Sequence, residues 1–363
     1  MRRHLLLRPV ALLLAAIAPA AIATAATTTD PLGRPAEMAR HPETGVLLAV
    51  TRAGGRLVAA GERGIVLLSD DNGASWRQAR VPASVTLTAL SFPTPETGWA
   101  VGHAGLILRS DDGGESWSRV LDGKDTAALE LAAAKAAASA DPAAQRRLRD
   151  ATQALDAALD NPLLDVGFLT PEHGFVIGAY GAIFETRDAG RHWQSRRDAL
   201  DNPRGKHLYR LYAAADRLYI AGEQGALFES SDEGDHFQAL ATPYRGTYFG
   251  VATQADAGLI AYGLRGNALQ SSDTGASWQA LDLGQPITVT ASASLPDRSL
   301  VLVDEAGRVL RRAAGGAVFQ ALKTPQSFSF TSVAVAADGG LVLAGIRGLT
   351  RIAPPILETA STP

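Results

Sequence analysis

Short apolar runs separated by turn-forming clusters dominate the chain from residue 46 onward. A representative stretch reads T-L-T-A-L-S-F, then G-W-A-V-G, then L-I-L-R, with Pro, Gly, Asp and Ser between the runs. Short runs rich in β-branched and aromatic residues, bounded by such turn residues, are typical of β-strands. The pattern therefore predicts an all-β protein made of many short strands joined by tight turns.

The strand pattern repeats about every forty residues, apart from one longer interval. A glycine opens the third strand of each unit, at Gly64, Gly105, Gly181, Gly225, Gly266, Gly307 and Gly348. Six of these glycines are followed twelve residues later by an aromatic residue: Trp76, Trp117, Trp193, Phe237, Trp278 and Phe319. Repeats of this length built from short strands are typical of β-propellers. The repeat predicts a seven-bladed β-propeller, with blades near residues 46–80, 86–120, 163–197, 208–240, 246–281, 287–321 and 330–352.

The aromatic residue ends a turn of the pattern S-x-D-x-G-x-x-W, known as an Asp box. The Asp and aromatic residues of five such boxes are Asp71 and Trp76, Asp112 and Trp117, Asp188 and Trp193, Asp232 and Phe237, and Asp273 and Trp278. Asp can accept hydrogen bonds from its own turn, Gly supplies a positive φ, and the aromatic ring covers the hairpin. A sixth copy has Arg312 and Ala314 in place of Ser and Asp. Because the motif tolerates this loss, we interpret the boxes as structural rather than catalytic.

The seventh unit ends after its third strand, at Gly348–Ile352, and is followed by Ala353-Pro354-Pro355. An unpaired sheet edge is usually covered. We expect residues 28–41 to add an N-terminal strand to this blade and so close the ring. The short tail Ile356–Glu358 is the alternative donor.

The long interval contains a helical insertion at residues 122–161. Ala, Leu, Arg, Lys and Gln are strong helix formers, and Asp141-Pro142 supplies a cap and a first-turn proline. The segment predicts an α-helical hairpin between blades 2 and 3, with helices at about Thr126–Ala140 and Pro142–Leu159. The hairpin either packs on the edge of the propeller or serves as a docking element for a partner helix.

The N-terminus has the features of a secretory signal peptide. Arg2, Arg3 and Arg8 precede an apolar stretch from Val10 to Ile22, and Ala23-Thr24-Ala25 forms an A-x-A cleavage site. We expect residues 1–25 to be removed near Ala25, and residues 26–363 to be periplasmic or secreted. An uncleaved anchor is the alternative, although the apolar stretch is short for a membrane span. Export by the general secretory route and by the twin-arginine route both remain open.

Composition narrows the possible functions. A formal net charge of −3 over 363 residues disfavours a nucleic-acid binder driven by bulk electrostatics. The chain has no cysteine, which excludes disulfides and thiolate metal sites. Its seven histidines lack the spacing of metal ligands, and no phosphate-binding loop or G-x-S-x-G element is present. We therefore expect neither a metal nor another cofactor.

Two stretches resemble a known family. T-P-E-T-G-W-A-V-G-H-A-G-L-I-L-R-S-D-D-G-G-E-S-W and T-P-E-H-G-F-V-I-G-A-Y-G-A-I-F-E-T-R-D-A-G-R-H-W resemble the photosystem II assembly and stability factor family. The segments 163–166 and 243–246 look like its exported relatives in non-photosynthetic bacteria. The resemblance implies a non-enzymatic seven-bladed propeller that assists other proteins, by means of an arginine-rich patch in the photosynthetic members. Some of the bacterial relatives are associated with exporters of the resistance-nodulation-division type.

The turns between the second and third strands should share one face with the blade-to-blade connections, opposite the Asp boxes. This places Arg63, Arg265 and Arg347 on one rim, with His103, Tyr180 and Gln224 at matching positions. The connections add Arg204, Lys206 and His207, and also Tyr244 and Arg245. Arginine suits carboxylate recognition, so we hypothesise that this face binds an extended or acidic segment of a protein, a membrane or envelope protein in particular. The alternative is a set of solvated arginines paired with Glu62 or nearby acids.

A glycoside hydrolase of the sialidase type is the rival function, because such enzymes also contain Asp boxes. That chemistry needs paired carboxylates, or a Tyr–acid pair beneath arginines. Candidates are Asp165, Glu172 and Tyr180. Paired acids are not evident in the inner strands, and fold membership does not confer activity, so we expect no catalytic residues.

Overall fold

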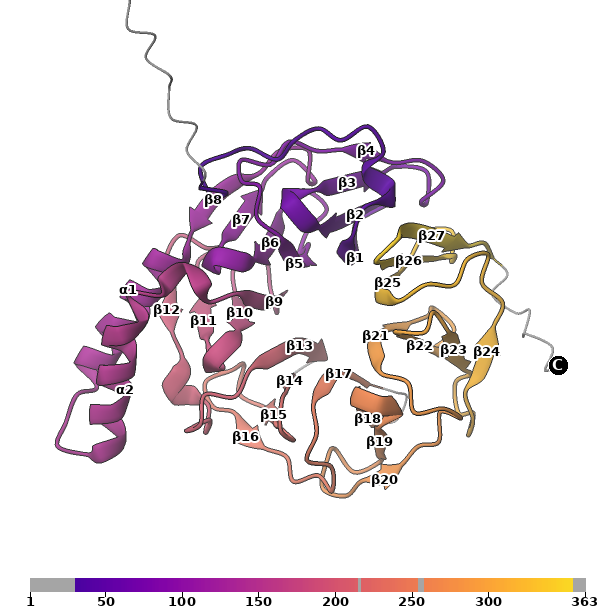
Figure 1. Cartoon of the computed structure of the whole chain (residues 1–363). Coiled ribbons are helices and arrows are strands. Elements are labelled where there is room, and N and C mark those ends of the chain that lie inside the picture. The colour runs from indigo at the N-terminus through magenta and orange to yellow at the C-terminus, as the bar shows by residue number, and fades with distance from the viewer. Residues whose placement is uncertain (1–29, 215–216, 254–257, 355–363) are drawn as a thin grey trace, which may run out of the picture.

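Each forty-residue unit folds into one antiparallel sheet, and seven such sheets stand around a central axis (Figure 1). The computed structural model describes residues 30–214, 217–253 and 258–354. The expected signal peptide and the tail Ile356–Glu358 lie outside the described residues. The predicted seven-bladed β-propeller is confirmed.

Blades 1 to 3 are four-stranded, and in each the strand order follows the sequence from the axis outward. Blade 1 contains β1 (Leu47–Ala53), β2 (Arg56–Gly61), β3 (Val66–Ser69) and β4 (Arg77–Gln78). Blade 2 contains β5 (Leu87–Ser91), β6 (Gly98–Gly102), β7 (Ile107–Ser110) and β8 (Ser118–Leu121). Blade 3 contains β9 (Leu163–Phe168), β10 (Gly174–Gly178), β11 (Ile183–Thr186) and β12 (Gln194–Ser195).

Blades 4 to 7 repeat this arrangement, except that three strands of blade 7 are described. Blade 4 contains β13 (Leu208–Ala214), β14 (Arg217–Gly222), β15 (Leu227–Ser230) and β16 (Gln238–Ala239). Blade 5 contains β17 (Tyr248–Thr253), β18 (Leu259–Gly263), β19 (Ala268–Ser271) and β20 (Gln279–Ala280). Blade 6 contains β21 (Val289–Ser294), β22 (Leu300–Asp304), β23 (Val309–Arg312) and β24 (Gln320–Leu322). Blade 7 contains β25 (Phe330–Val335), β26 (Leu341–Gly345) and β27 (Gly348–Ile352).

The second residue of every innermost strand is a bulge. In β1, for example, Leu47 pairs with Gly61 and Ala49 with Ala60, so one residue between them is left over. A bulge leaves its extra residue outside the ladder and re-aims its side chain. The seven bulge residues, hereafter the axial ring, are Leu48, Thr88, Leu164, Tyr209, Phe249, Thr290 and Thr331.

The hydrophobic core lies between neighbouring blades. Trp99 in β6 is fully buried; its ring stacks on Phe168 of blade 3 at 5.1 Å and meets Trp193 of that blade edge-on at 5.8 Å. A Cβ at Gly190, in the blade 3 Asp box, would lie 2.0 Å from the same indole. The layer between blades 2 and 3 therefore depends on large rings fitted against a glycine-containing turn.

The predicted N-terminal strand in blade 7 is wrong for the described residues. Residues 30–41 contain no strand and instead follow blade 1, where the Ala36 amide donates to the Val81 carbonyl (3.0 Å) and the Ser84 amide to Pro31 (2.8 Å). Pro31 and Pro35 lack the amide donor that a ladder needs, and partners in the nearby 79–84 connection take up this segment.

The seam between blades 7 and 1 is closed by side chains. The Thr331 hydroxyl donates to the Leu47 carbonyl (2.7 Å), and the Val50 amide donates to Ser332 Oγ (3.2 Å). Arg351 Nε donates to the Asn72 carbonyl on the outer part of blade 1 (2.8 Å). The ring is therefore closed without a strand shared between the two ends of the described chain.

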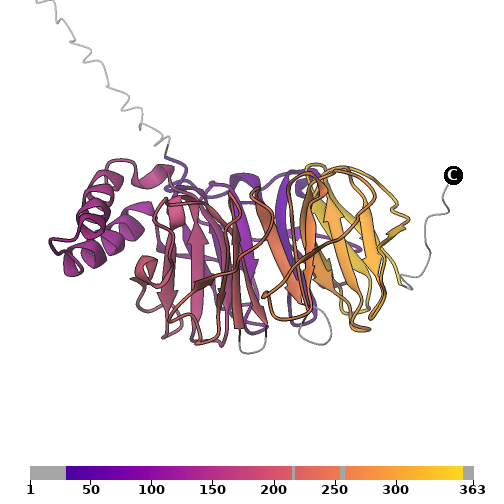
Figure 2. The ribbon, with the colours of Figure 1, turned by 90° about the horizontal axis from the view of Figure 1, so that it is seen from below.

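The insertion forms the predicted helical hairpin, which projects from the rim beside blades 2 and 3 (Figures 1 and 2). Helix α1 (Gly123–Ala136) begins earlier than expected because Asp122 and Asp125 form a capping box, and α2 (Pro142–Ala154) begins at the proline capped by Asp141. Glu130 of α1 is buried, accepts two hydrogen bonds from Arg147 of α2 and one from Ser195 of β12. These contacts hold the hairpin against the outer edge of blade 3.

Among the described residues, neither helix combines the length and apolar character needed to span a membrane.

Candidate functional site

The Asp boxes lie on one face of the ring, hereafter the box face, and their polar groups bond to their own turns. In blade 1, Ser69 Oγ donates to Asp71 Oδ1 (2.7 Å) and accepts from the Gly73 amide (2.8 Å), while the Ser75 amide also donates to Asp71 (2.9 Å). The Ser75 hydroxyl, together with these bonds, lowers the pKa of Asp71 to about 2. The carboxylate therefore stays ionised as a structural acceptor.

Blades 3 and 4 place a histidine where the other complete boxes have a second serine. His192 Nδ1 lies 2.6 Å from Asp188 Oδ2, and His236 Nδ1 lies 2.9 Å from Asp232 Oδ2. The backbone amide of each histidine is the main cause that lowers the pKa of its Asp to about 2. Histidine thus replaces the serine hydroxyl within the same turn.

Arginines on the box face connect each of several blades to the next. The fourth box residue is left-handed in Asn72, Gly113 and Ala189, and this conformation exposes its carbonyl to the preceding blade. Arg351, Arg56 and Arg109 donate to these three carbonyls at 2.8, 3.1 and 2.7 Å, respectively. These arginines also pair with carboxylates, namely Asp338, Asp70 and Asp111.

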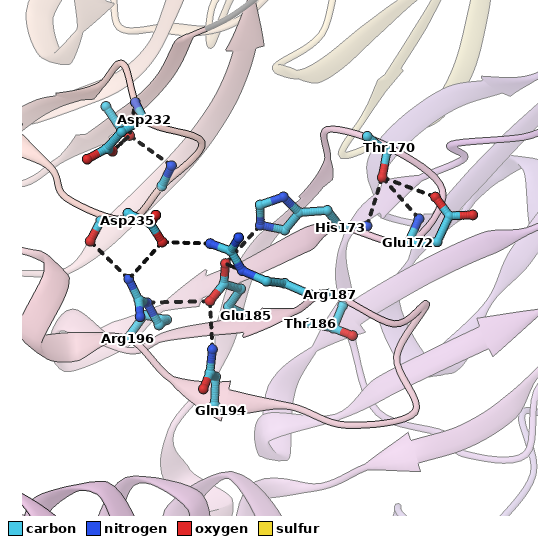
Figure 3. A network of polar contacts seen from close by, with 12 residues as sticks. Thr170, Glu172, His173, Glu185, Thr186, Arg187, Gln194, Arg196, Asp232 and Asp235 are labelled. Atoms are coloured by element: carbon cyan, nitrogen blue, oxygen red, sulfur yellow. Dashed lines mark hydrogen bonds and ion pairs between the residues drawn. The ribbon is translucent and has the colours of Figure 1, made fainter.

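A buried glutamate organises a polar network between blades 3 and 4 (Figure 3). Glu185 in β11 is fully buried and accepts hydrogen bonds from Arg187 Nε (2.7 Å) and Gln194 Nε2 (2.8 Å); His173 Nε2 lies 2.8 Å away. Arg187 and Arg196 both continue to Asp235 in the next Asp box. Because Glu185 has no exposed surface and its arginine partners reach Asp235 of the next blade, it is a structural link between the blades.

The degenerate sixth box borders a cavity of about 250 Å³ on the box face, lined by residues including Gln270, Ser272, Arg298 and Arg312. Arg312 is buried, donates to Gln270 Oε1 (2.9 Å) and lies over the Phe319 ring at 5.5 Å. Burial lowers its pKa. The arginine that replaces the box serine thus joins blades 6 and 5 and holds its aromatic residue.

The candidate catalytic residues do not come together. Asp165 is buried in β9, where its carboxylate accepts from the Leu211 amide (2.7 Å) and lies 3.6 Å from Arg210 Nε; burial raises its pKa, and Arg210 opposes that rise. Glu172 lies in the β9–β10 turn on the box face, and Tyr180 in the β10–β11 turn at the opposite end of the strand. The described residues also contain no cluster of three potential metal-ligating side chains.

The opposite face, hereafter the turn face, carries the G-x-x-G turns. In blades 1 to 5 the third turn residue is left-handed, which is uncommon outside glycine: Arg63, Ala104, Tyr180, Gln224 and Arg265 have φ between 53° and 56°. The expected match of His103 to this position is wrong, because His103 lies one residue earlier in its turn. Arg63, Tyr180, Gln224 and Arg265 are exposed at the tips of these turns.

The basic candidate residues of the turn face lack carboxylate partners, unlike Arg308 of the same face, which pairs with Asp304 (2.6 Å). Among the described residues, no ion pair engages any of the basic candidates, Arg63, Arg204, Lys206, Arg245, Arg265 and Arg347. The expected ion pairs with Glu62 are absent among the described residues, whereas the exposure of these arginines agrees with the solvated surface that the same alternative expects.

The glutamates of this face bind backbone amides instead. Glu62, Glu223 and Glu305 occupy the second position of their turns and accept from the amides of Val46 (3.4 Å), His207 (2.9 Å) and Thr288 (3.2 Å). Each glutamate thus fixes the chain entering an innermost strand. The geometry leaves the neighbouring arginines facing solvent.

The candidates of blades 3 to 5 lie on two neighbouring blade-to-blade connections, β12–β13 and β16–β17, and on the β18–β19 turn. Lys206 Nζ donates to the Gln224 carbonyl (3.1 Å), and its pKa is lowered by burial and by the nearby charges of Arg204 and Arg245. Tyr244 donates to the Leu264 carbonyl (3.2 Å), and burial raises its pKa against the opposing effect of Arg265. Arg63 and Arg347 belong to blades 1 and 7 and lie outside this group.

A chain of aromatic rings runs from this rim toward the axis. The ring centroids of Tyr180 and His207 are 4.9 Å apart, those of His207 and Tyr209 are 6.4 Å apart, and those of Tyr209 and Phe249 are 5.2 Å apart. His207 Nδ1 accepts from the Tyr180 amide (2.8 Å), which fixes the start of the chain. Tyr180 has 57% of its surface exposed, and the last two rings are half-buried.

Sequence reasoning did not find Tyr209 and Phe249. An alignment of the blades on the anchor glycine is needed to single them out. In that alignment both residues occupy the axial-ring position, where blades 2, 6 and 7 have threonine.

Comparison with solved structures shows the same fold in proteins of low sequence identity. The structure described as "YCF48 bound to D1 peptide" is 18% identical, with a TM-score of 0.63 over 87% of this chain and 96% of that chain. YCF48 from Cyanidioschyzon merolae is 16% identical, with a TM-score of 0.61 over 88% and 98% of the two chains. Streptogramin B lyase, which is 12% identical, has a TM-score of 0.64 over 86% and 95%. At these identities the likeness concerns the fold alone.

The sequence itself identifies the family. None of the curated proteins matches it significantly. The sequence model of one family, described as "Photosynthesis system II assembly factor YCF48", matches residues 48–127 and 144–281, which together are more than half of the chain. The chain therefore belongs to the YCF48 family of photosystem II assembly factors, as the quoted stretches and the repeated Asp boxes predict.

Proposed function

We propose that this protein is a non-enzymatic assembly or accessory factor that binds an extended acidic segment of a partner protein on its turn face. The observation that carries the proposal is the contrast between the two faces. The arginines that link neighbouring blades on the box face are paired with carboxylates, whereas the six candidate cations of the turn face have no such partner among the described residues.

An acidic segment would supply the missing partners. Arginine presents a planar set of donors that matches a carboxylate, and charge-assisted bonds are about twice as strong as neutral ones. Complementary charge also speeds diffusional encounter and selects among partners. The related structure whose description names a bound D1 peptide supports a peptide as the type of ligand.

Charge reversal of the group near blade 4 tests the proposal. Arg204, Lys206 and Arg245 replaced together by Glu should abolish capture of the partner from the producing cell, because both attraction and steering reverse sign. Reversal of Arg63, Arg265 and Arg347 should weaken capture in the same way.

A photo-crosslinking residue at position 180 should trap the same partner, and one at position 298 on the box face is the control. Equal crosslinking at both positions, or unchanged capture by the charge-reversed proteins, would sink the proposal. Fluorogenic sialosides and β-glycosides test the rival enzyme function, and we expect no turnover of either.

We also propose that the protein acts after export and that its partner is a membrane or envelope protein, such as a component of an exporter. The charged start, the short apolar stretch and the Ala23-Thr24-Ala25 site support export. Mass spectrometry of the protein from the periplasmic fraction should find an N-terminus near Ala26. Recovery of the full-length chain in the cytoplasm would contradict export and leave the binding proposal to its own tests.

A further inference from the structure

We infer that the bound segment places an aromatic or long aliphatic side chain on Tyr209 and Phe249, beside the acidic residues that face Lys206 and Arg245. The inference rests on the proposed function, since it specifies the partner segment of the same face. It adds an apolar anchor to the electrostatic recognition described above.

The axial ring divides into two chemical classes. In blades 2, 6 and 7 the bulge residue is threonine, and its hydroxyl donates to the carbonyl of the first residue of the next innermost strand. Thr88 donates to Leu163 (2.7 Å), Thr290 to Phe330 (2.8 Å) and Thr331 to Leu47 (2.7 Å). Here the bulge links one blade to the next.

The other four bulge residues are apolar or aromatic and cannot make this bond through a short hydroxyl. They are Leu48, Leu164, Tyr209 and Phe249, all half-buried. Leu164, Tyr209 and Phe249 belong to three consecutive blades, and the rings of the last two meet at 5.2 Å. Apolar side chains therefore remain partly accessible at the turn-face end of blades 3 to 5, although in other blades a threonine at the same position bonds to the next blade.

The polar surroundings set the chemistry of the ligand. The aromatic chain continues outward through His207 to the exposed Tyr180. Arg204 and Lys206 lie on the connection that carries His207, and Arg245 lies on the next connection, close enough to lower the pKa of Lys206. Binding sites commonly combine a buried apolar anchor with a few charged groups that orient it. An acidic peptide with one apolar anchor fits both halves of this surface.

Short fluorescent peptides test the inference with the purified protein. The first peptide has several Glu residues around a Leu-Phe pair, the second has Ala-Ala in place of that pair, and the third has Gln in place of every Glu. Fluorescence anisotropy should show that the second peptide binds roughly tenfold or more weakly than the first, as expected for loss of a buried apolar side chain.

The outcomes separate the two proposals. Equal affinity of the first and second peptides would overturn the anchor and leave the acidic recognition standing. Equal affinity of the first and third peptides would overturn the acidic recognition and leave the anchor. No binding of the first peptide would overturn both.

Matched variants locate the anchor site. Tyr209→Thr with Phe249→Thr introduces the residue that blades 2, 6 and 7 already use, so the variant should fold. It should bind the first and second peptides equally, at the affinity of the second. Thr331→Val is the control, because it removes an inter-blade bond of the same axial ring far from the anchor; it should keep the roughly tenfold preference. A preference that survives in the double variant would refute the assignment.

Discussion

Substitution of Gly190 by alanine should destabilise the propeller far more than the same substitution at Gly284. Both glycines have a φ of 78°, so alanine at either position adopts the same left-handed backbone. A Cβ at Gly284 meets no atom within 4 Å, whereas a Cβ at Gly190 lies 2.0 Å from Trp99 Cη2. The pair of variants therefore separates backbone strain from packing.

The magnitude follows from these two terms. Left-handed alanine costs about 1–2 kcal/mol relative to glycine, and this cost is common to both variants. Trp99 cannot move aside, because it is fully buried between Phe168 and Trp193. Overpacking of such a site costs a further 1–3 kcal/mol or so. Gly190→Ala should thus lose about 2–5 kcal/mol of unfolding free energy, and Gly284→Ala about 1–2 kcal/mol.

Differential scanning calorimetry is the assay. For a chain of this size, 1 kcal/mol corresponds to roughly 1–2 °C in Tm, so the two variants should differ by roughly 1–6 °C. Near-ultraviolet circular dichroism should change only for Gly190→Ala, since that variant alone disturbs the indole cluster. Equal melting temperatures of the two variants would refute the packing argument.

Three further predictions concern the polar contacts. Glu185→Gln should lower the free energy of unfolding by about 2–4 kcal/mol, because it removes a buried charge that faces two arginines. Asp111→Asn should lower it by less than about 1 kcal/mol, because the Asp111 side chain is 65% exposed. Equal melting temperatures of the two variants in calorimetry would contradict this prediction. The pKa of Asp71 is about 2 in the folded protein against an ordinary 3.8, so the contribution of Asp71 to stability is present above about pH 4 and lost as the pH falls toward 2. Asp71→Asn should therefore make Tm decline less steeply in that range. An unchanged slope would count against the hydrogen bonds of Asp71 as the cause of the lowered pKa. Thr331→Val and Ser332→Ala should each lower the free energy of unfolding by about 1 kcal/mol, and hydrogen exchange should become faster in β1 and β25 than in the other strands. Uniform exchange across the blades would show that these bonds do not hold the seam.

Local chemistry made most of the fold predictable from the sequence. An aromatic residue follows six of the anchor glycines at a fixed distance because these hairpins need the same turn and the same apolar cover. Asp141-Pro142 marks the start of α2 for an equally local reason. The N-terminal strand was predicted from an open sheet edge alone. The competing hydrogen bonds join this segment to the Val81 carbonyl and the Ser84 amide beside blade 1, and no pattern within residues 28–41 encodes them.

The candidate site was only partly predictable. Arg63, Arg265 and Arg347 fall on one face because turn positions follow from strand order, but whether an arginine is paired depends on residues of another blade. Glu62 lies beside Arg63 in sequence and nevertheless bonds to the Val46 amide. The half-exposed rings of Tyr209 and Phe249 could not be placed either, since a one-residue bulge reverses the side that an alternating strand pattern assigns.

The closure of the ring has a consequence for how such a protein can evolve. Every described sheet is built from one uninterrupted stretch of chain, and no strand is exchanged between the first and last blades. Duplication or deletion of one unit in a gene would therefore add or remove a whole blade and leave the others intact. The new neighbours would need compatible side chains in the core between them and at the seam, such as the threonine and serine of β25. Recombination can therefore change the number of blades in such a ring without changing the strand connectivity within any blade.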